Sequence, residues 1–146
     1  MLRWALVAGL LGGLGQSAAE HRSRGIDLLR QSQADEAIVE LEEALRLDPQ
    51  SSATRFHLGR ALLAVGRLDK AADELQSALP GSTDPGAVHY QLGLVWFAAD
   101  RLADAWSELT LALESHPDLR PAEYQRAEVC YRTGAVSEAR RRLSAL

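Results

Sequence analysis

Four histidines and one cysteine are the side chains in this sequence best suited to metal binding or nucleophilic chemistry. The histidines stand at positions 21, 57, 89 and 116, and none is followed by a second metal ligand three or four residues later. Cys130 has no second cysteine to pair with, and the chain lacks a glycine-rich phosphate loop and a nucleophile elbow. Metal sites need several ligands at short, defined spacings. We therefore expect no enzyme, no metal, no cofactor and no small-molecule substrate.

These side chains also fit structural roles. We expect His89 to face the interior and His116 to belong to a turn beside a proline. Cys130 is expected to be a small buried apolar residue, the alternative being a reactive or intermolecular thiol.

The composition indicates an all-α protein. Leucine and alanine, with 25 and 24 copies, supply about a third of the 146 residues, whereas isoleucine, valine and threonine together number 13. Helices favour Leu and Ala, and strands favour β-branched residues. The length suits one domain. The formal net charge of -4 argues against a nucleic-acid partner, which would require an excess of cations.

The first nineteen residues are typical of an export signal. Arg3 precedes the apolar stretch Trp4–Leu14, and Ser17 and Ala19 are the small residues that a signal peptidase recognises. The apolar stretch is shorter than the roughly 20 residues that cross a bilayer as a helix. We expect cleavage after Ala19 and a periplasmic or secreted protein. The alternatives are an uncleaved membrane tether and a first helix of the domain.

The rest of the chain repeats every 34 residues. Small residues and leucines recur in register, in the columns Gly25, Gly59, Gly93 and Ala127; Ala37, Ala71, Ala105 and Ala139; and Leu41, Leu75, Leu109 and Leu143. A fixed period of this length is typical of stacked supersecondary units. We divide residues 20–146 into an array whose units are 18–51, 52–85, 86–119 and a shorter 120–146.

Each unit is predicted to form two amphipathic helices, because its apolar residues follow the helical period. Gly66 and Gly134 stand between the helices of their units, where a glycine takes a positive φ. Asp84 followed by Pro85 is typical of an N-cap with proline at the first helical position. The columns of Gly and Ala predict that the paired helices cross with their backbones close together.

The pattern resembles the tetratricopeptide repeat family. The third unit carries that signature most fully, in the order Leu92, Gly93, Trp96, Ala105, Leu109, Ala112 and Pro117. The resemblance covers the chain from about residue 18 onward. It implies an α-solenoid of helix-turn-helix repeats that wind into a right-handed superhelix.

Two units depart from the family pattern. His21 and Arg24 are polar where a preceding unit would pack, as is expected of an N-terminal cap. Glu123 and Arg126 occupy the same positions in the fourth unit, which puts the packing of that unit in question. The fourth unit is also short, so we expect an open apolar edge for docking or self-association, formed by Val136, Ala139, Leu143 and Leu146.

The family resemblance implies a ligand groove along the first helices of the units. The groove residues carried over are Arg22, Arg30, Phe56, His57, Arg60, Tyr90, Gln91, Leu94, Tyr124, Glu128, Tyr131 and Arg132. This surface is rich in aromatic side chains and Arg, which favours an extended peptide of acidic character. For Tyr131 and Phe97 the alternative is packing between neighbouring helices. The second helices carry many acidic residues, interpreted as a solvated face: Glu36, Glu40, Glu42, Glu43, Asp73, Glu74 and Glu108.

These patterns favour an exported, non-catalytic scaffold that binds a protein or peptide partner in its groove. The alternative is a structural subunit of an envelope complex that self-assembles through the open C-terminal edge. The chain contains no Asn, and the resemblance therefore argues against the family members that clamp a terminal carboxylate with Lys and Asn.

Overall fold

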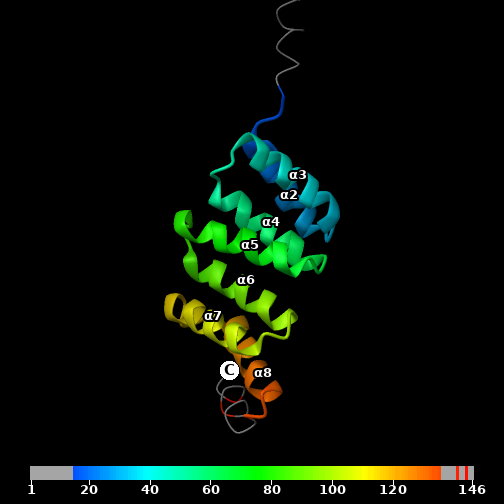
Figure 1. Ribbon diagram of the computed structural model, residues 1–146. Helices are drawn as coiled ribbons and strands as arrows, with labels where there is room; N and C mark the ends of the chain where they lie inside the picture. The colour runs from blue at the N-terminus through cyan, green and yellow to red at the C-terminus, as the bar shows by residue number, and fades with distance from the viewer. Residues whose placement is uncertain (1–14, 136–140, 142–143, 145–146) are drawn as a thin grey trace, which may run out of the picture.

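The computed structural model describes residues 15–135, 141 and 144, and in these ranges the regular structure is entirely helical. The helices stack in chain order from one end of the molecule to the other (Figure 1). Their bounds are α2 Ala18–Arg30, α3 Ala34–Leu47, α4 Ser52–Ala64, α5 Leu68–Ala78, the 3-10 turn η1 Leu79–Gly81, α6 Pro85–Ala98, α7 Leu102–Ser115 and α8 Arg120–Arg132. None of the described helices has both the length and the apolar character needed to span a membrane.

The helices form antiparallel hairpins that nest against their neighbours. α2 packs most extensively on α3, α4 on α5, and α6 on α7. The first helices of successive hairpins, α2, α4, α6 and α8, also contact one another in turn, whereas α3, α5 and α7 make no comparable contacts among themselves. The first helices are therefore the more closely spaced layer of the stack. The fold is the all-α solenoid expected from the sequence.

The glycine column lets each hairpin close over a leucine. A Cβ built at Gly59 would lie 2.5 Å from Leu75 Cγ and 3.3 Å from the Ala71 carbonyl oxygen. The same relation joins Gly25 to Leu41 and Gly93 to Leu109. The expected close crossing is therefore present, but the group that needs the space is chiefly a leucine side chain rather than the facing alanine. That leucine and Ala37, Ala71 and Ala105 are fully buried in their hairpins.

The turn inside each hairpin requires one residue with a positive φ. Gly66 and Gly134 have φ values of 75° and 82°, as predicted. Ser32 and Asp100 occupy the equivalent position in their units, with φ values of 61° and 60°. The turn geometry is thus imposed by the repeat even where the residue is not glycine.

A repeated contact between a histidine or arginine and a glutamate ties the two helices of each of the first three hairpins. His21 Nδ1 lies 2.6 Å from Glu40 Oε2. The equivalent pairs are Arg55 with Glu74 at 2.8 Å and His89 with Glu108 at 2.7 Å. All six side chains are largely shielded from solvent, with 15–28% of each exposed.

These pairs correct two interpretations made from the sequence. His21 is not polar merely because it ends the array, since Arg55 and His89 occupy the same position inside it. Arg24 also contacts Glu40, at 3.2 Å. Glu40, Glu74 and Glu108 are therefore hairpin partners rather than members of a solvated acidic face, because a half-buried carboxylate needs a partner.

The fourth unit packs through α8 despite its charged residues. Arg126 Nη2 donates to Glu123 Oε1 at 2.8 Å, and the Arg126 guanidinium lies 5.2 Å from the centre of the Trp106 ring. Ala127 and Cys130 are buried, the latter as predicted. The sequence left open whether the fourth unit packs on the third, and this hydrogen bond and ring contact explain how its charged residues are accommodated.

The two ends of the chain bear on other sequence predictions. Ser17 caps α2: its hydroxyl accepts from the Glu20 backbone N–H at 3.2 Å, and its own N–H donates to the Glu20 carboxylate at 2.7 Å. The predicted cleavage site after Ala19 lies in the first turn of this helix. The apolar stretch before residue 15 and the edge residues Val136, Ala139, Leu143 and Leu146 lie outside the described residues.

Candidate functional site

Two adjoining pockets run along the first helices. The α4 pocket, of about 260 Å³, is lined by Ser52, Ala53, Phe56, His57, Gly81, Ser82, Thr83, Asp84 and Ala87. The α6 pocket, of about 480 Å³, is lined by Asp84, Ala87, Tyr90, Gln91, Ser115, His116, Pro117, Asp118 and Leu119. Asp84 and Ala87 border both pockets, so the pockets adjoin at the start of α6, and we refer to the two together as the groove.

His57 is the most perturbed titratable group of the α4 pocket. Burial lowers the pKa of its imidazole to about 4, with further lowering by Arg60, Arg22 and Arg30. Its Nδ1 is buried and has no hydrogen-bond partner among the described residues. The imidazole is therefore neutral at pH 7. Because a buried N–H without an acceptor is costly, Nε2 carries the proton and is the ring's donor.

Phe56 and three arginines surround this histidine. The Phe56 ring meets His57 edge to face, with 5.2 Å between the ring centres. The exposed Arg60 lies with its guanidinium carbon 5.8 Å from the centre of Phe56. Arg22 donates to Ser51 Oγ at 3.4 Å, and Arg30 is paired with Asp27 at 2.9 Å on the surface of α2. The α2–α4 end of the groove is thus cationic and aromatic.

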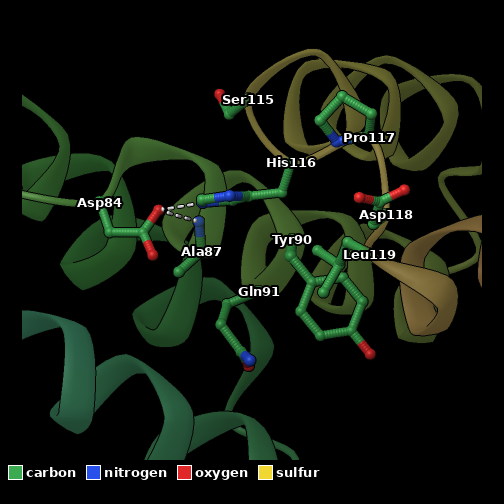
Figure 2. A pocket seen from close by; sticks show the side chains of 9 residues that line it. All are labelled: Asp84, Ala87, Tyr90, Gln91, Ser115, His116, Pro117, Asp118 and Leu119. Atoms are coloured by element: carbon green, nitrogen blue, oxygen red, sulfur yellow. Dashed lines mark hydrogen bonds and ion pairs between the residues drawn. The ribbon is translucent and has the colours of Figure 1, made fainter.

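The α6 pocket is built between the start of α6 and the connection from α7 to α8 (Figure 2). Asp84 is the N-cap of α6, as predicted, and its Oδ1 accepts from the Ala87 N–H at 3.0 Å and faces His116 Nε2 at 2.7 Å. These hydrogen bonds, led by that from His116, lower the pKa of Asp84. Tyr90 is half-buried, and burial raises the pKa of its hydroxyl. This end of the groove is acidic.

The structure distributes the sequence-predicted groove residues unevenly. Phe56 and His57 line the α4 pocket, Tyr90 and Gln91 line the α6 pocket, and Arg22, Arg30 and Arg60 lie near His57. These three arginines line neither pocket, and the remaining predicted residues do not line one either. They are the half-buried Leu94, the partly exposed Glu128, Arg132, which donates to Asp100 at 2.5 Å, and the exposed Tyr124 and Tyr131.

The loops between units supply pocket residues that the sequence did not reveal. Asp84 and His116 attracted attention only as a helix cap and a turn, and Asp118 and Leu119 showed no signal. The prolines at positions 85 and 117 do mark these loops. They do not indicate that both loops border the same first helix.

The described residues contain no group of three His, Cys, Asp or Glu side chains placed to hold a metal ion. The three histidines in close pairs each contact a single carboxylate: Glu40, Glu108 and Asp84.

The hairpins, their 34-residue period and their glycine–leucine packing define a class of helical-repeat protein. Residues 28–92 match the family model described as tetratricopeptide repeat. Residues 28–92 therefore carry tetratricopeptide repeats, as the sequence pattern predicted. No curated protein matches the chain.

Solved structures share the fold at low sequence identity. The crystal structure of MamA has a TM-score of 0.82 at 20% identity, over 94% of this chain and 80% of that chain. TTC0263, a thermophilic tetratricopeptide repeat protein of Thermus thermophilus, has a TM-score of 0.77 at 22% identity, over 88% and 72%. The first such domain of Spaghetti (RPAP3), bound to the HSP90 peptide SRMEEVD, has a TM-score of 0.76 at 18% identity, over 82% and 94%.

Proposed function

We propose that this protein is a non-catalytic interaction module that binds an extended peptide segment of a partner protein along α4 and α6. The observation that carries the proposal is the pair of adjoining pockets that the first turns of α4 and α6 form with the loops between units. A groove built on rigid, packed helices offers a preformed surface, which lowers the entropic cost of binding.

The α2–α4 end favours acidic side chains of the ligand. Arg60 is exposed beside Phe56, and its guanidinium can form two parallel hydrogen bonds to a carboxylate. The imidazole of His57 is neutral at pH 7, and its Nε2–H adds an uncharged hydrogen-bond donor. An anion bound here would also reduce the mutual repulsion among the cations around His57.

The similar fold of the RPAP3 domain, solved with the acidic peptide SRMEEVD, supports a peptide as the ligand. This chain contains no Asn, so it cannot hold a terminal carboxylate with a Lys and Asn clamp. The donors that it offers beside the α4 pocket are Arg60 and His57.

The test is selection from a displayed library of random peptides on the immobilised full-length protein. We expect enriched peptides to carry Asp or Glu. Binding of a selected peptide should weaken by about tenfold in Arg60→Ala, since a hydrogen bond to a charged group contributes about 1.5–3 kcal/mol. Arg67→Ala, which removes an exposed Arg at the turn between α4 and α5, is the matched control and should bind normally.

Failure to enrich any peptide would refute the proposal. So would peptides whose binding is equally unaffected by Arg60→Ala and Arg67→Ala, since they would bind elsewhere.

We also propose that the chain is exported through its apolar N-terminal segment. Mass spectrometry of the protein recovered from cell fractions tests this. A periplasmic or secreted form that starts at Glu20 would support cleavage after Ala19, although it would lack the Ser17 cap of α2. A cytoplasmic chain with residue 1 intact would refute export.

A further inference from the structure

The two ends of the groove carry opposite charges. At the α2–α4 end, Arg22, Arg30 and Arg60 lie near His57. No Lys or Arg lines either pocket, but the three arginines lie on the α2–α4 side, whereas Asp84 stands between the pockets and Asp118 lines only the α6 pocket. His116 is the one residue lining the α6 pocket that is able to become cationic, and it is hydrogen-bonded to Asp84.

The acidic charge of the α6 pocket is permanent at neutral pH. The hydrogen bonds from His116 and Ala87 both end on Asp84 Oδ1 and hold the pKa of this carboxyl below its usual value. Asp118 lies on the exposed connection between α7 and α8, and its carboxylate borders the same pocket.

The remaining lining suits an aliphatic or cationic side chain. Tyr90 presents a half-buried aromatic ring, and Leu119 and Pro117 add apolar surface (Figure 2). A lysine or arginine can pack its methylene stem against such a surface while its charge remains near carboxylates and water. An aromatic ring attracts a cation further through its π face.

From this arrangement we infer that the groove binds a peptide of mixed charge in one orientation, with acidic side chains over α2 and α4 and a lysine or arginine side chain in the α6 pocket. The inference rests on the proposed function and adds a second, opposite specificity to it. Asp118 is the residue we assign to the cation, because its exposed carboxylate is not a helix cap.

The peptide library tests both specificities with two further variants. We expect peptides enriched on the wild-type protein to combine Asp or Glu with a Lys or Arg at a fixed separation. Selection on Asp118→Asn should lose the Lys or Arg and keep the acidic residues. Asp73→Asn, which neutralises an exposed Asp on α5, is the matched control and should enrich the same peptides as wild type.

One selected peptide then measures the coupling between its Lys or Arg and Asp118 directly. Replacing its Lys or Arg with Met should weaken binding about two- to fivefold in the wild-type protein, as expected for an exposed cation with a carboxylate and an aromatic ring. The same replacement should have a clearly smaller effect in Asp118→Asn, where only the aromatic ring and Asp84 remain near the cation; an equal effect in both proteins would overturn the assignment of Asp118.

The outcomes separate this inference from the proposed function. Peptides that are only acidic, depend on Arg60 and ignore Asp118 would overturn the inference and leave the proposed function standing. If no peptide is enriched, both fall.

Discussion

Adding one methyl group at Gly59 should destabilise the second hairpin. The new Cβ would lie 2.5 Å from Leu75 Cγ, 2.9 Å from Leu75 Cδ2 and 3.3 Å from the Ala71 carbonyl oxygen. Leu75 is fully buried, and the atom nearest the new Cβ is its branching Cγ rather than a terminal methyl group. The side chain therefore cannot relieve the contact by turning into solvent. Overpacking costs about 1–3 kcal/mol, and an approach of 2.5 Å to a fully buried side chain belongs to the upper half of that range, whereas the better helix propensity of Ala returns about 1 kcal/mol. We expect Gly59→Ala to lower the free energy of unfolding by about 1–2 kcal/mol.

A double-mutant cycle isolates the contact. Leu75→Ala alone should cost about 2–5 kcal/mol through the cavity that it leaves. In Gly59→Ala/Leu75→Ala the new methyl group enters that cavity, so the double variant should be more stable than the sum of the two losses by about 1–2 kcal/mol. The assay is urea unfolding followed by circular dichroism.

The control for helix propensity is the neighbouring exposed position. The difference between Arg60→Ala and Arg60→Gly calibrates Ala against Gly in α4 without a packing contact. A Gly59→Ala variant as stable as wild type, or an additive cycle, would refute the packing argument.

Three further predictions concern the turns, the ion pairs and the helix caps. Ser32→Gly should raise the melting temperature, with a gain of about 0.5–1 kcal/mol, because φ at this residue is 61°; a decrease would contradict the strained turn. Arg55→Glu places a second carboxylate beside that of Glu74 and should lower the free energy of unfolding in urea by about 1–2 kcal/mol. Adding Glu74→Arg should recover part of this loss. A double variant no better than the sum of its single changes would refute the pairing. The lowered folded-state pKa of Asp84 means that its stabilising effect is complete above the ordinary value of 3.8 and is lost as the pH falls through the folded-state pKa. The difference in unfolding free energy between wild type and Asp84→Ala should therefore shrink below pH 3.8, and a constant difference would refute the role of the cap.

Local signals in the sequence were sufficient for the helical units. Gly66, Gly134 and the Asp84 cap act within a few residues of their own positions, so their roles follow from the chain itself. The turn residues Ser32 and Asp100 were missed because the prediction relied on glycine, although both stand in the 34-residue register of Gly66 and Gly134 and Asp is enriched at positive φ.

The groove was harder to predict because it depends on two loops that are far apart in the chain. Asp84 and His116 meet at 2.7 Å although 32 residues separate them. Their contact depends on how one hairpin places its connection against the start of α6, and nothing local to either residue indicates it. Tyr90 and Gln91 were found from the sequence because they lie on a first helix, which the repeat register identifies.

The sequence by itself determined that the chain forms helical hairpins and which residues fall on equivalent faces, because helix propensity, apolar spacing and glycine act locally and recur with the period. Only the tertiary structure decided how the charges are used. It placed Glu40, Glu74 and Glu108 against a histidine or arginine inside the hairpins instead of on a solvated face. It also made the α6 pocket acidic, in contrast to the cationic end at His57. The physical reason is that a charge acts on whatever lies within a few ångströms of it, and those neighbours come from helices and loops that only packing brings together.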